Sequence, residues 1–250
     1  MTKTALITQI IPLASHDGPG MRTTLFFKGC SLQCAWCHNP ETIAFHQQLM
    51  WRERLCIACK ECLKNSNSHL SLGDYIKDAL KNNKIEAASY CPAKAFRLAA
   101  KEYTVDMIVK EISKYADLNK SMGGGVTFSG GEPMTHSAFI EDVIDELADK
   151  NIHFAIDTCA EVSFDKYIRL LPKINLLLFD IKESDAQKHK LFTGRENTLI
   201  IDNLIKIIDF IKTNNLSCKL WIRTPLIPKM TSSEENIRGI WTPKEISPEY

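Results

Sequence analysis

The chain alternates short apolar runs with segments of helical periodicity, and this alternation constrains its fold more than any other feature. The helical segments lie near Val105–Tyr115, Phe139–Leu147, Phe164–Leu171 and Leu199–Thr213. The apolar runs lie at Thr23–Lys28, Val126–Phe128, His153–Thr158, Asn175–Lys182 and Cys218–Thr224. Near-continuous apolar strands alternating with helices are typical of a parallel sheet covered by helices. We therefore expect an α/β protein with five core strands, preceded by an edge strand at Ile7–Leu13.

Polar residues gather where these strands end. They are Gly130, Gly131 and Glu132, then Asp157 and Thr158, then Asp180 and Lys182, and finally Arg223. Parallel strands of α/β barrels present their carboxyl ends to one mouth, where ligands bind. The sequence therefore predicts one pocket surrounded by these groups.

A cysteine loop follows the first core strand. Cys30, Cys34 and Cys37 are spaced C-x3-C-x2-C, so three thiolates can converge on one centre. Three thiolates without a fourth nearby cysteine indicate a metal centre with one open coordination position, which marks a reactive centre. The preceding Asp17-Gly18-Pro19-Gly20 segment predicts a turn that lines the same mouth.

A second cysteine group predicts an insertion over residues 51–100. Cys56, Cys59 and Cys62 repeat every third position, and Cys91 precedes a proline. This is a ferredoxin-like way to supply four thiolates to a cubane iron–sulfur cluster, although a zinc site could use the same residues. Disulfides fit less well, because the nine cysteines are odd in number and no secretion signal precedes them. The isolated Cys159 and Cys218 are interpreted as buried structural thiols.

Composition excludes several classes of function. Lysine and arginine (31) balance aspartate and glutamate (30), giving a net charge of +1 that favours neither nucleic acid nor an anionic membrane. No signal-type core or bilayer-spanning run is present, so we expect a cytoplasmic protein with no membrane partner.

The domain organisation follows from these segments. Residues 1–50 and 101–229 are expected to form the core, 51–100 the insertion, and 230–250 a polar tail. Only Glu235–Arg238 offers a helix in the tail, so a sixth, closing strand is expected to be missing and the end to be truncated.

The motifs, taken in order, resemble one family. Asp17–Arg22, the C-x3-C-x2-C loop, Ser129–Pro133 and Asp180-Ile181-Lys182 are similar to the radical S-adenosylmethionine (SAM) enzymes that activate glycyl radical enzymes, such as the pyruvate formate-lyase activators. The Cys56–Cys91 insertion resembles the subgroup with a ferredoxin-like region. The resemblance implies a partial (β/α)6 TIM-like barrel of the radical SAM type.

The resemblance also implies a site. Cys30, Cys34 and Cys37 would ligate a [4Fe–4S] cluster whose open iron chelates S-adenosyl-L-methionine, and the later four cysteines a second [4Fe–4S] cluster. No catalytic residue is expected beyond cluster and cofactor. The residues expected to contact the cofactor are Trp36, Cys37, His38, Gly130, Gly131, Glu132, Asp180, Ile181, Lys182 and Arg223, the last also paired with Asp157 in a second interpretation.

The implied reaction is reductive cleavage of S-adenosylmethionine to a 5′-deoxyadenosyl radical. This radical takes hydrogen from a glycine of a partner such as formate C-acetyltransferase. A flavodoxin or ferredoxin would donate the electron, and the chain would act as a monomer. Two alternatives stay open: a radical SAM enzyme acting on a small molecule, and an inactive iron–sulfur or zinc module in which His38 is a fourth zinc ligand.

Overall fold

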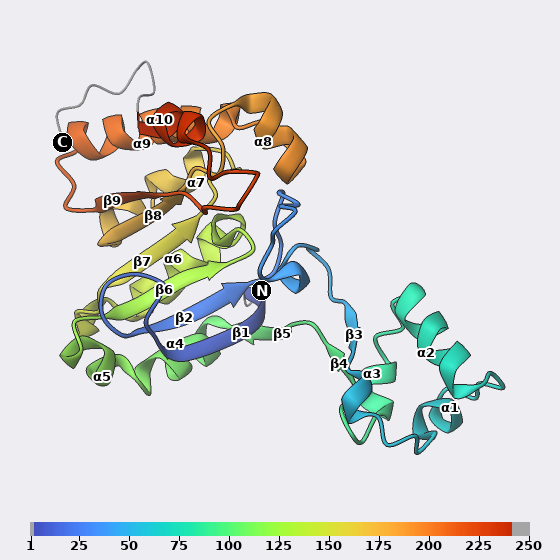
Figure 1. Ribbon diagram of the computed structural model, residues 1–250. Helices are drawn as coiled ribbons and strands as arrows, with labels where there is room; N and C mark the ends of the chain where they lie inside the picture. The colour runs from blue at the N-terminus through green and yellow to red at the C-terminus, as the bar shows by residue number, and fades with distance from the viewer. Residues whose placement is uncertain (1–2, 242–250) are drawn as a thin grey trace. The chain divides into compact units, whose positions relative to one another are not determined.

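The main sheet of the molecule is mostly parallel. The computed structural model describes residues 3–241, and its seven-stranded sheet has the order β5-β1-β2-β6-β7-β8-β9 (Figure 1). The last five strands in this order are parallel to one another. They are β2 (Arg22–Phe27), β6 (Gly125–Gly130), β7 (Phe154–Thr158), β8 (Leu176–Asp180) and β9 (Lys219–Arg223). The five core strands expected from the sequence are confirmed.

The first strand is not the edge of this sheet. β1 (Thr4–Ala14) pairs antiparallel with β2, but β5 (Lys101–Thr104) lies on its outer side. The prediction of a strand at Ile7–Leu13 is therefore correct, but the prediction that this strand forms the edge of the sheet is wrong. β5 is short and polar, and such a strand gives no periodic apolar signal.

Helices occupy the connections between the parallel strands. Thr104 caps α4 by accepting a hydrogen bond from the Met107 amide at 3.3 Å. The helices of this unit are α4 (Val105–Ser113), α5 (Ala116–Ser121), α6 (Ser137–Glu146), α7 (Asp165–Ile168), α8 (Ala186–Thr193), α9 (Thr198–Thr213) and α10 (Glu234–Trp241).

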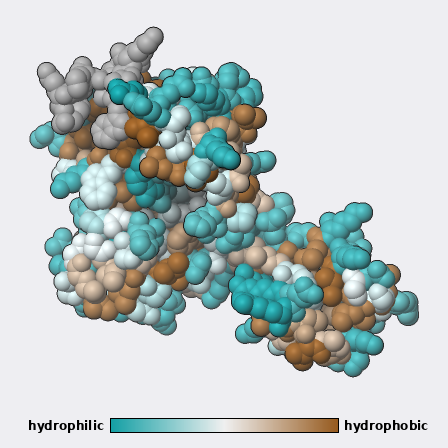
Figure 2. All heavy atoms as spheres, in the orientation of Figure 1, coloured by the Kyte–Doolittle hydropathy of each residue, from teal (hydrophilic) through white to brown (hydrophobic). Residues whose placement is uncertain are grey.

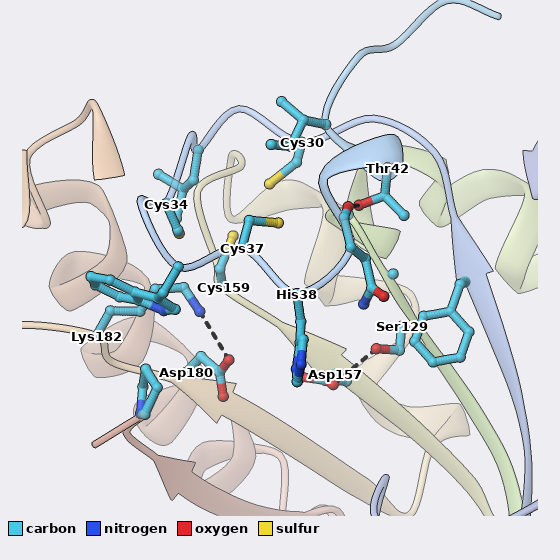
Figure 3. A pocket seen from close by; sticks show the side chains of 18 of the residues that line it. Cys30, Cys34, Cys37, His38, Thr42, Ser129, Asp157, Cys159, Asp180 and Lys182 are labelled. Carbon is cyan, nitrogen blue, oxygen red and sulfur yellow. Dashed lines mark hydrogen bonds and ion pairs between the residues drawn. The ribbon is translucent and has the colours of Figure 1, made fainter. Parts of the chain in front are cut away.

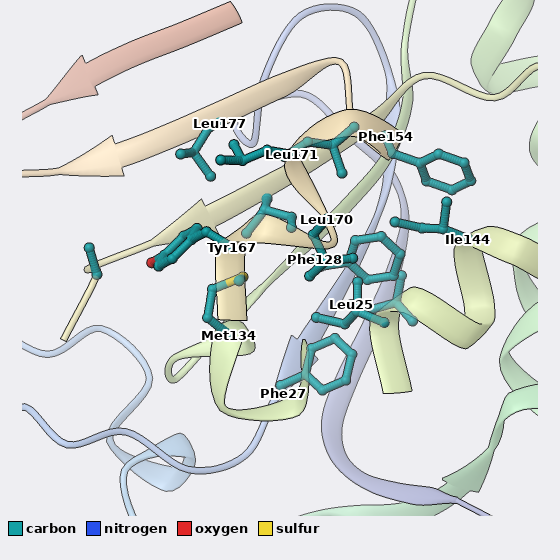
Figure 4. Packing of buried hydrophobic residues seen from close by; sticks show 14 of the residues in the cluster. Leu25, Phe27, Phe128, Met134, Ile144, Phe154, Tyr167, Leu170, Leu171 and Leu177 are labelled. Carbon is teal, nitrogen blue, oxygen red and sulfur yellow. The ribbon is translucent and has the colours of Figure 1, made fainter. Parts of the chain in front are cut away.

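The core lies between the sheet and these helices. Leu25, Phe128 and Leu177 from three strands are fully buried and belong to one cluster with Ile144 of α6 and with Leu170, which follows α7 (Figure 4). Burying each such side chain contributes about 1.5–3 kcal/mol, so the apolar runs of the sequence hold the sheet in place.

A second compact unit comprises Ala44–Lys101. It contains a two-stranded sheet of β3 (Leu49–Trp51) and β4 (Phe96–Leu98), with α1 (Glu61–Asn65), α2 (Leu72–Lys81) and α3 (Ala87–Tyr90). Its own core includes Tyr75 and Phe96. The unit begins before residue 51, where the sequence placed its start, because β3 pairs with β4.

The segment after β9 packs on the main unit. Ile240 of α10 is 7% exposed and joins the main core, and the Asn236 side chain accepts a hydrogen bond from the Ser184 amide at 2.7 Å. Residues 230–241 are therefore not a separate tail, and residues 242–250 lie outside the described part of the chain. Within residues 3–241 no strand follows β9.

No helix in the described part of the chain is both long and apolar enough to cross a bilayer. The surface mixes hydrophilic and hydrophobic residues in both units (Figure 2).

Candidate functional site

A cavity of about 510 Å³ opens at the carboxyl ends of the parallel strands (Figure 3). Drug-sized ligands occupy cavities of about 300–1,000 Å³, so this one can hold a cofactor. Its lining includes Asp17, Cys30, Cys34, Trp36, Cys37, His38, Ser129, Gly130, Gly131, Asp157, Cys159, Asp180 and Lys182.

The cysteine loop is closed by bonds between its two ends. The Gly29 amide donates to the Thr42 carbonyl at 2.6 Å, and the Cys30 amide donates to the Ile43 carbonyl at 2.9 Å. The buried Lys28 ammonium donates to the Glu41 carbonyl at 2.5 Å. The loop thus leaves the sheet and returns at a fixed place, which confines its three thiols to the cavity.

The far side of the loop is held by α8. The amides of Gln33 and Ala35 donate to the carbonyls of Thr193 and Phe192, at 2.8 and 2.9 Å. Trp36 also packs edge-on against Phe192, with ring centroids 6.1 Å apart. The position of the second and third cysteines therefore depends on a helix far away in the sequence.

The Gly-Gly-Glu segment contacts the start of this loop. The Gly131 amide donates to the Phe27 carbonyl at 2.9 Å, and the Glu132 amide to the Gly29 carbonyl at 2.8 Å. A Cβ on Gly130 would lie 2.3 Å from the Phe27 nitrogen, and the φ of Gly130 is +113°. Glycine is required here because two backbones touch.

Glu132 is fully buried and does not line the cavity. Its carboxylate accepts hydrogen bonds from the amides of Met134, Cys159 and Ala160, the Thr158 hydroxyl and the Cys159 thiol, at 2.8–3.1 Å. Burial raises the pKa of Glu132, while these donors lower it. The side chain holds the end of β7 in place.

A network of two acids and two bases forms the polar wall. Arg223 donates to Asp157 and, at 3.0 Å, to Asp180, and Lys182 donates to Asp180 at 3.0 Å. Burial and the neighbouring Asp180 charge raise the pKa of Asp157 to about 7. Burial acts in the same direction on the pKa of Asp180, but Lys182 and Arg223 outweigh it and lower that pKa. Asp180 is therefore the permanently charged member of the pair.

The three loop thiols differ in acidity. The interaction with the neighbouring Cys159 thiol is the largest influence on Cys30 and lowers its pKa, whereas burial raises the pKa of Cys34 to about 11 and also raises that of Cys37. Cys34 is thus a neutral thiol at pH 7, and a metal that binds it must displace the proton.

Cys159 belongs to the site. The sequence indicated a structural thiol, and it is indeed buried, but it lines the cavity and donates to Glu132 at 3.0 Å. Figure 3 shows its sulfur pointing toward those of Cys30 and Cys37. Cys218 packs in the main core, as expected.

The structure brings most of the predicted site residues together. Trp36, Cys37, His38, Gly130, Gly131, Asp180 and Lys182 line the cavity with the loop cysteines and Asp17. Glu132, Ile181 and Arg223 do not line it: Glu132 and Ile181 are buried beside it, and Arg223 binds the two aspartates. Ser129 and Thr42 also line the cavity, although the sequence predicted no contact for either: Ser129 precedes the Gly-Gly-Glu segment, and Thr42 lies outside every motif.

Comparisons with known proteins show the family to which the chain is related. A family profile described as "4Fe-4S single cluster domain" matches residues 16–201. The chain is 38% identical over 237 residues to the trans-4-hydroxy-L-proline dehydratase activating enzyme of Clostridioides difficile, covering 93% of this chain and 76% of the relative. It is 35% identical to the 4-hydroxyphenylacetate decarboxylase activating enzyme of Clostridium scatologenes, covering 94% and 77%. A solved domain of a pyruvate-formate lyase-activating enzyme from Bacteroides vulgatus is 32% identical, covering 46% of this chain and 68% of that one, with a TM-score of 0.40.

The mainly parallel α/β sheet and the cysteine-lined cavity at its strand ends define an iron–sulfur enzyme of the radical SAM class. More particularly, the chain belongs to the family of activating enzymes for glycyl radical enzymes. Its activity is the activation of such a partner by radical SAM chemistry.

Proposed function

We propose that the cavity holds a [4Fe–4S] cluster on Cys30, Cys34 and Cys37, with S-adenosylmethionine on the open iron. The observation that carries this proposal is the convergence of three thiols from one closed loop on a cavity that also exposes Gly130 and Gly131. Soft thiolates are the ligands that iron–sulfur clusters take. When bound, cluster and cofactor supply a one-electron reductive cleavage that yields methionine and a 5′-deoxyadenosyl radical, which takes hydrogen from a partner's glycine.

The chain's own residues bind and orient the cofactor. Gly130 and Gly131 give its amino-acid end close access to the backbone, and Trp36 with His38 lies beside its nucleoside. Lys182 places a positive charge on the cavity wall, where a carboxylate would bind. Glu132 and Arg223 act indirectly, by fixing β7 and the two aspartates.

The finer description of the fold fits this role. The strands β2, β6, β7, β8 and β9 correspond to the first five of a (β/α)6 barrel of the radical SAM type.

The second unit is proposed to hold an auxiliary [4Fe–4S] cluster in a ferredoxin-like insertion. Cys56, Cys59, Cys62 and Cys91 all line one small cavity, together with Trp51 and Phe96. Ala58 and Lys60, which lie between these cysteines, have positive φ values of 52° and 59°. Non-glycine residues adopt this conformation at a cost, and here it bends the segment that carries three of the four cysteines lining the cavity.

Iron analysis with two serine variants tests both clusters. The anaerobically reconstituted chain should hold about eight irons, and Cys34→Ser should lose 5′-deoxyadenosine formation. Cys59→Ser should lose auxiliary iron and keep the first cluster. If Cys59→Ser abolishes both, the two sites are not separate.

A glycyl radical enzyme is the proposed substrate, and a flavodoxin- or ferredoxin-type protein the electron donor of this monomeric activase. Co-expression with glycyl radical enzymes from the same genome, followed by anaerobic electron paramagnetic resonance, identifies the partner by its radical signal. Its absence with every such enzyme, while 5′-deoxyadenosine still forms, would favour a small-molecule substrate.

A further inference from the structure

The second unit carries a strong positive charge that the whole-chain balance conceals. Residues 44–101 contain seven lysines and three arginines against three glutamates and two aspartates, a net charge of +5. The chain as a whole has +1, so the remainder has −4. Two compact units of opposite charge attract different partners.

The positive charges surround the four-cysteine cavity. Lys60 lines it, Arg52 and Lys94 directly follow the lining residues Trp51 and Ala93, and Arg54 lies two residues before Cys56. All four cationic side chains are exposed, and the described structure records no ion pair for any of them.

Two other lysines of the unit are paired with acids. Lys64 binds Glu61 at 2.7 Å, and Lys84 binds Asp78 at 2.6 Å. Around the cavity, the single exposed acid among the four cations is Glu53. Among the exposed cations of the unit for which no ion pair is recorded, the four named above lie on segments that form the cavity, and Lys77 and Lys81 lie on α2.

Apolar and redox-active atoms lie exposed between these cations. The Ile57 side chain is 69% exposed and sits between two of the cysteines in the sequence, and Cys59 is itself exposed. An apolar centre with a charged rim is the usual anatomy of a protein interface. An interface of this kind brings a partner within electron-transfer range of the cysteines.

We propose that the face formed by Arg52, Arg54, Ile57, Lys60 and Lys94 docks a one-electron carrier protein whose redox centre is ringed by carboxylates. This inference rests on the proposed auxiliary cluster, which accepts the electron. The carrier is oxidised by one electron and the cluster is reduced by one, with no bond made or broken. Carboxylates on the carrier neutralise the rim and speed the encounter at low salt.

A nucleic acid fits this face less well. Phosphate backbones are bound by rows of cations and by helix N-termini. Such contacts do not involve an exposed isoleucine side chain beside cysteines. The exposed apolar centre favours a protein, and the position at the thiols favours a redox protein.

Charge reversal at the rim tests the proposal on the fully loaded chain. Arg52→Glu with Arg54→Glu removes two rim cations, and Lys77→Glu with Lys81→Glu is the matched control on α2, where both lysines are exposed. Stopped-flow absorbance follows the oxidation of chemically reduced flavodoxin by each protein. Iron content shows separately whether the auxiliary cluster is present.

The arginine variant should oxidise flavodoxin about tenfold more slowly at low salt, and the difference should vanish near 1 M salt, where the Debye length is about 3 Å. The lysine control and the reduction by dithionite should be unchanged. Equal rates for all proteins, or equal losses in both variants, would overturn the docking face. Unchanged flavodoxin oxidation with slower radical installation would assign the face to the glycyl radical partner instead. Four irons per chain would overturn the auxiliary cluster, and the rates would still decide the docking face.

Discussion

Replacing Glu132 by glutamine should destabilise the protein rather than simply weaken cofactor binding. In Glu132→Gln an amide NH₂ stands where one carboxylate oxygen accepts from the amides of Cys159 and Ala160. The Cys159 amide and the Cys159 thiol then lose their acceptor, at about 1–3 kcal/mol each, whereas the Ala160 amide still donates to the Thr158 hydroxyl at 2.9 Å. Part of this loss is offset because a neutral amide is cheaper to bury than a carboxylate, whose pKa burial raises.

The net effect is about 3 kcal/mol, or a fall of about 6–12 °C in Tm for a chain of this size. Anaerobic thermal unfolding followed by circular dichroism measures it. Glu146→Gln, at an exposed position of α6, is the matched control and should change stability by less than about 0.5 kcal/mol. An unchanged Tm for Glu132→Gln with weaker S-adenosylmethionine binding would refute the reasoning, because Glu132 would then contact the cofactor directly.

Three further substitutions probe the frame of the site. Gly130→Ala should cost about 3 kcal/mol or more in urea unfolding, because its Cβ overlaps the Phe27 backbone. Arg22→Met should cost a similar amount, because the buried guanidinium donates to the carbonyls of Val126 and His153; a loss under about 1 kcal/mol would contradict this. Asp157→Asn tests how the stability depends on pH. The pKa of Asp157 is about 7 in the folded protein, above its ordinary value of 3.8, so the folded state holds this proton more tightly than the unfolded state. The unfolding free energy of the wild type should therefore fall by about 1.4 kcal/mol per pH unit relative to the variant between about pH 4 and 7. A difference in unfolding free energy between the two proteins that is the same at pH 5.5, 6.5 and 7.5 would contradict this prediction.

The sequence predicted the parallel sheet and most of the cavity wall for a physical reason. Apolar runs such as Asn175–Lys182 have to be buried on both faces, and polar residues at their ends then share one edge. The positions of Asp180 and Lys182 on the cavity follow directly from that rule. Sequence spacing likewise placed Cys30 and Cys37 together, because the loop is short.

What the sequence could not predict depends on contacts between distant segments. The sequence predicted Glu132 and Arg223 to contact the cofactor. The type of a charged residue at a strand end does not reveal whether its side chain contacts a ligand or another part of the protein. Only the folded chain shows that the Ala160 amide donates to the Glu132 carboxylate, whereas the ion pair of Arg223 with Asp157, the second interpretation of the sequence, is confirmed. Cys159 was similarly ambiguous, because a lone thiol in an apolar strand gives no sign of facing other sulfurs.

The bond between the cysteine loop and α8 has a consequence for biogenesis. The loop amides of Gln33 and Ala35 serve as the cap of a helix that ends at Thr193, so they satisfy carbonyls that a helix terminus leaves open. A nascent chain that has exposed only its first hundred residues has the three cysteines but not this support. The loop that carries the three cysteines therefore gains these two hydrogen bonds only after the chain has folded past residue 193.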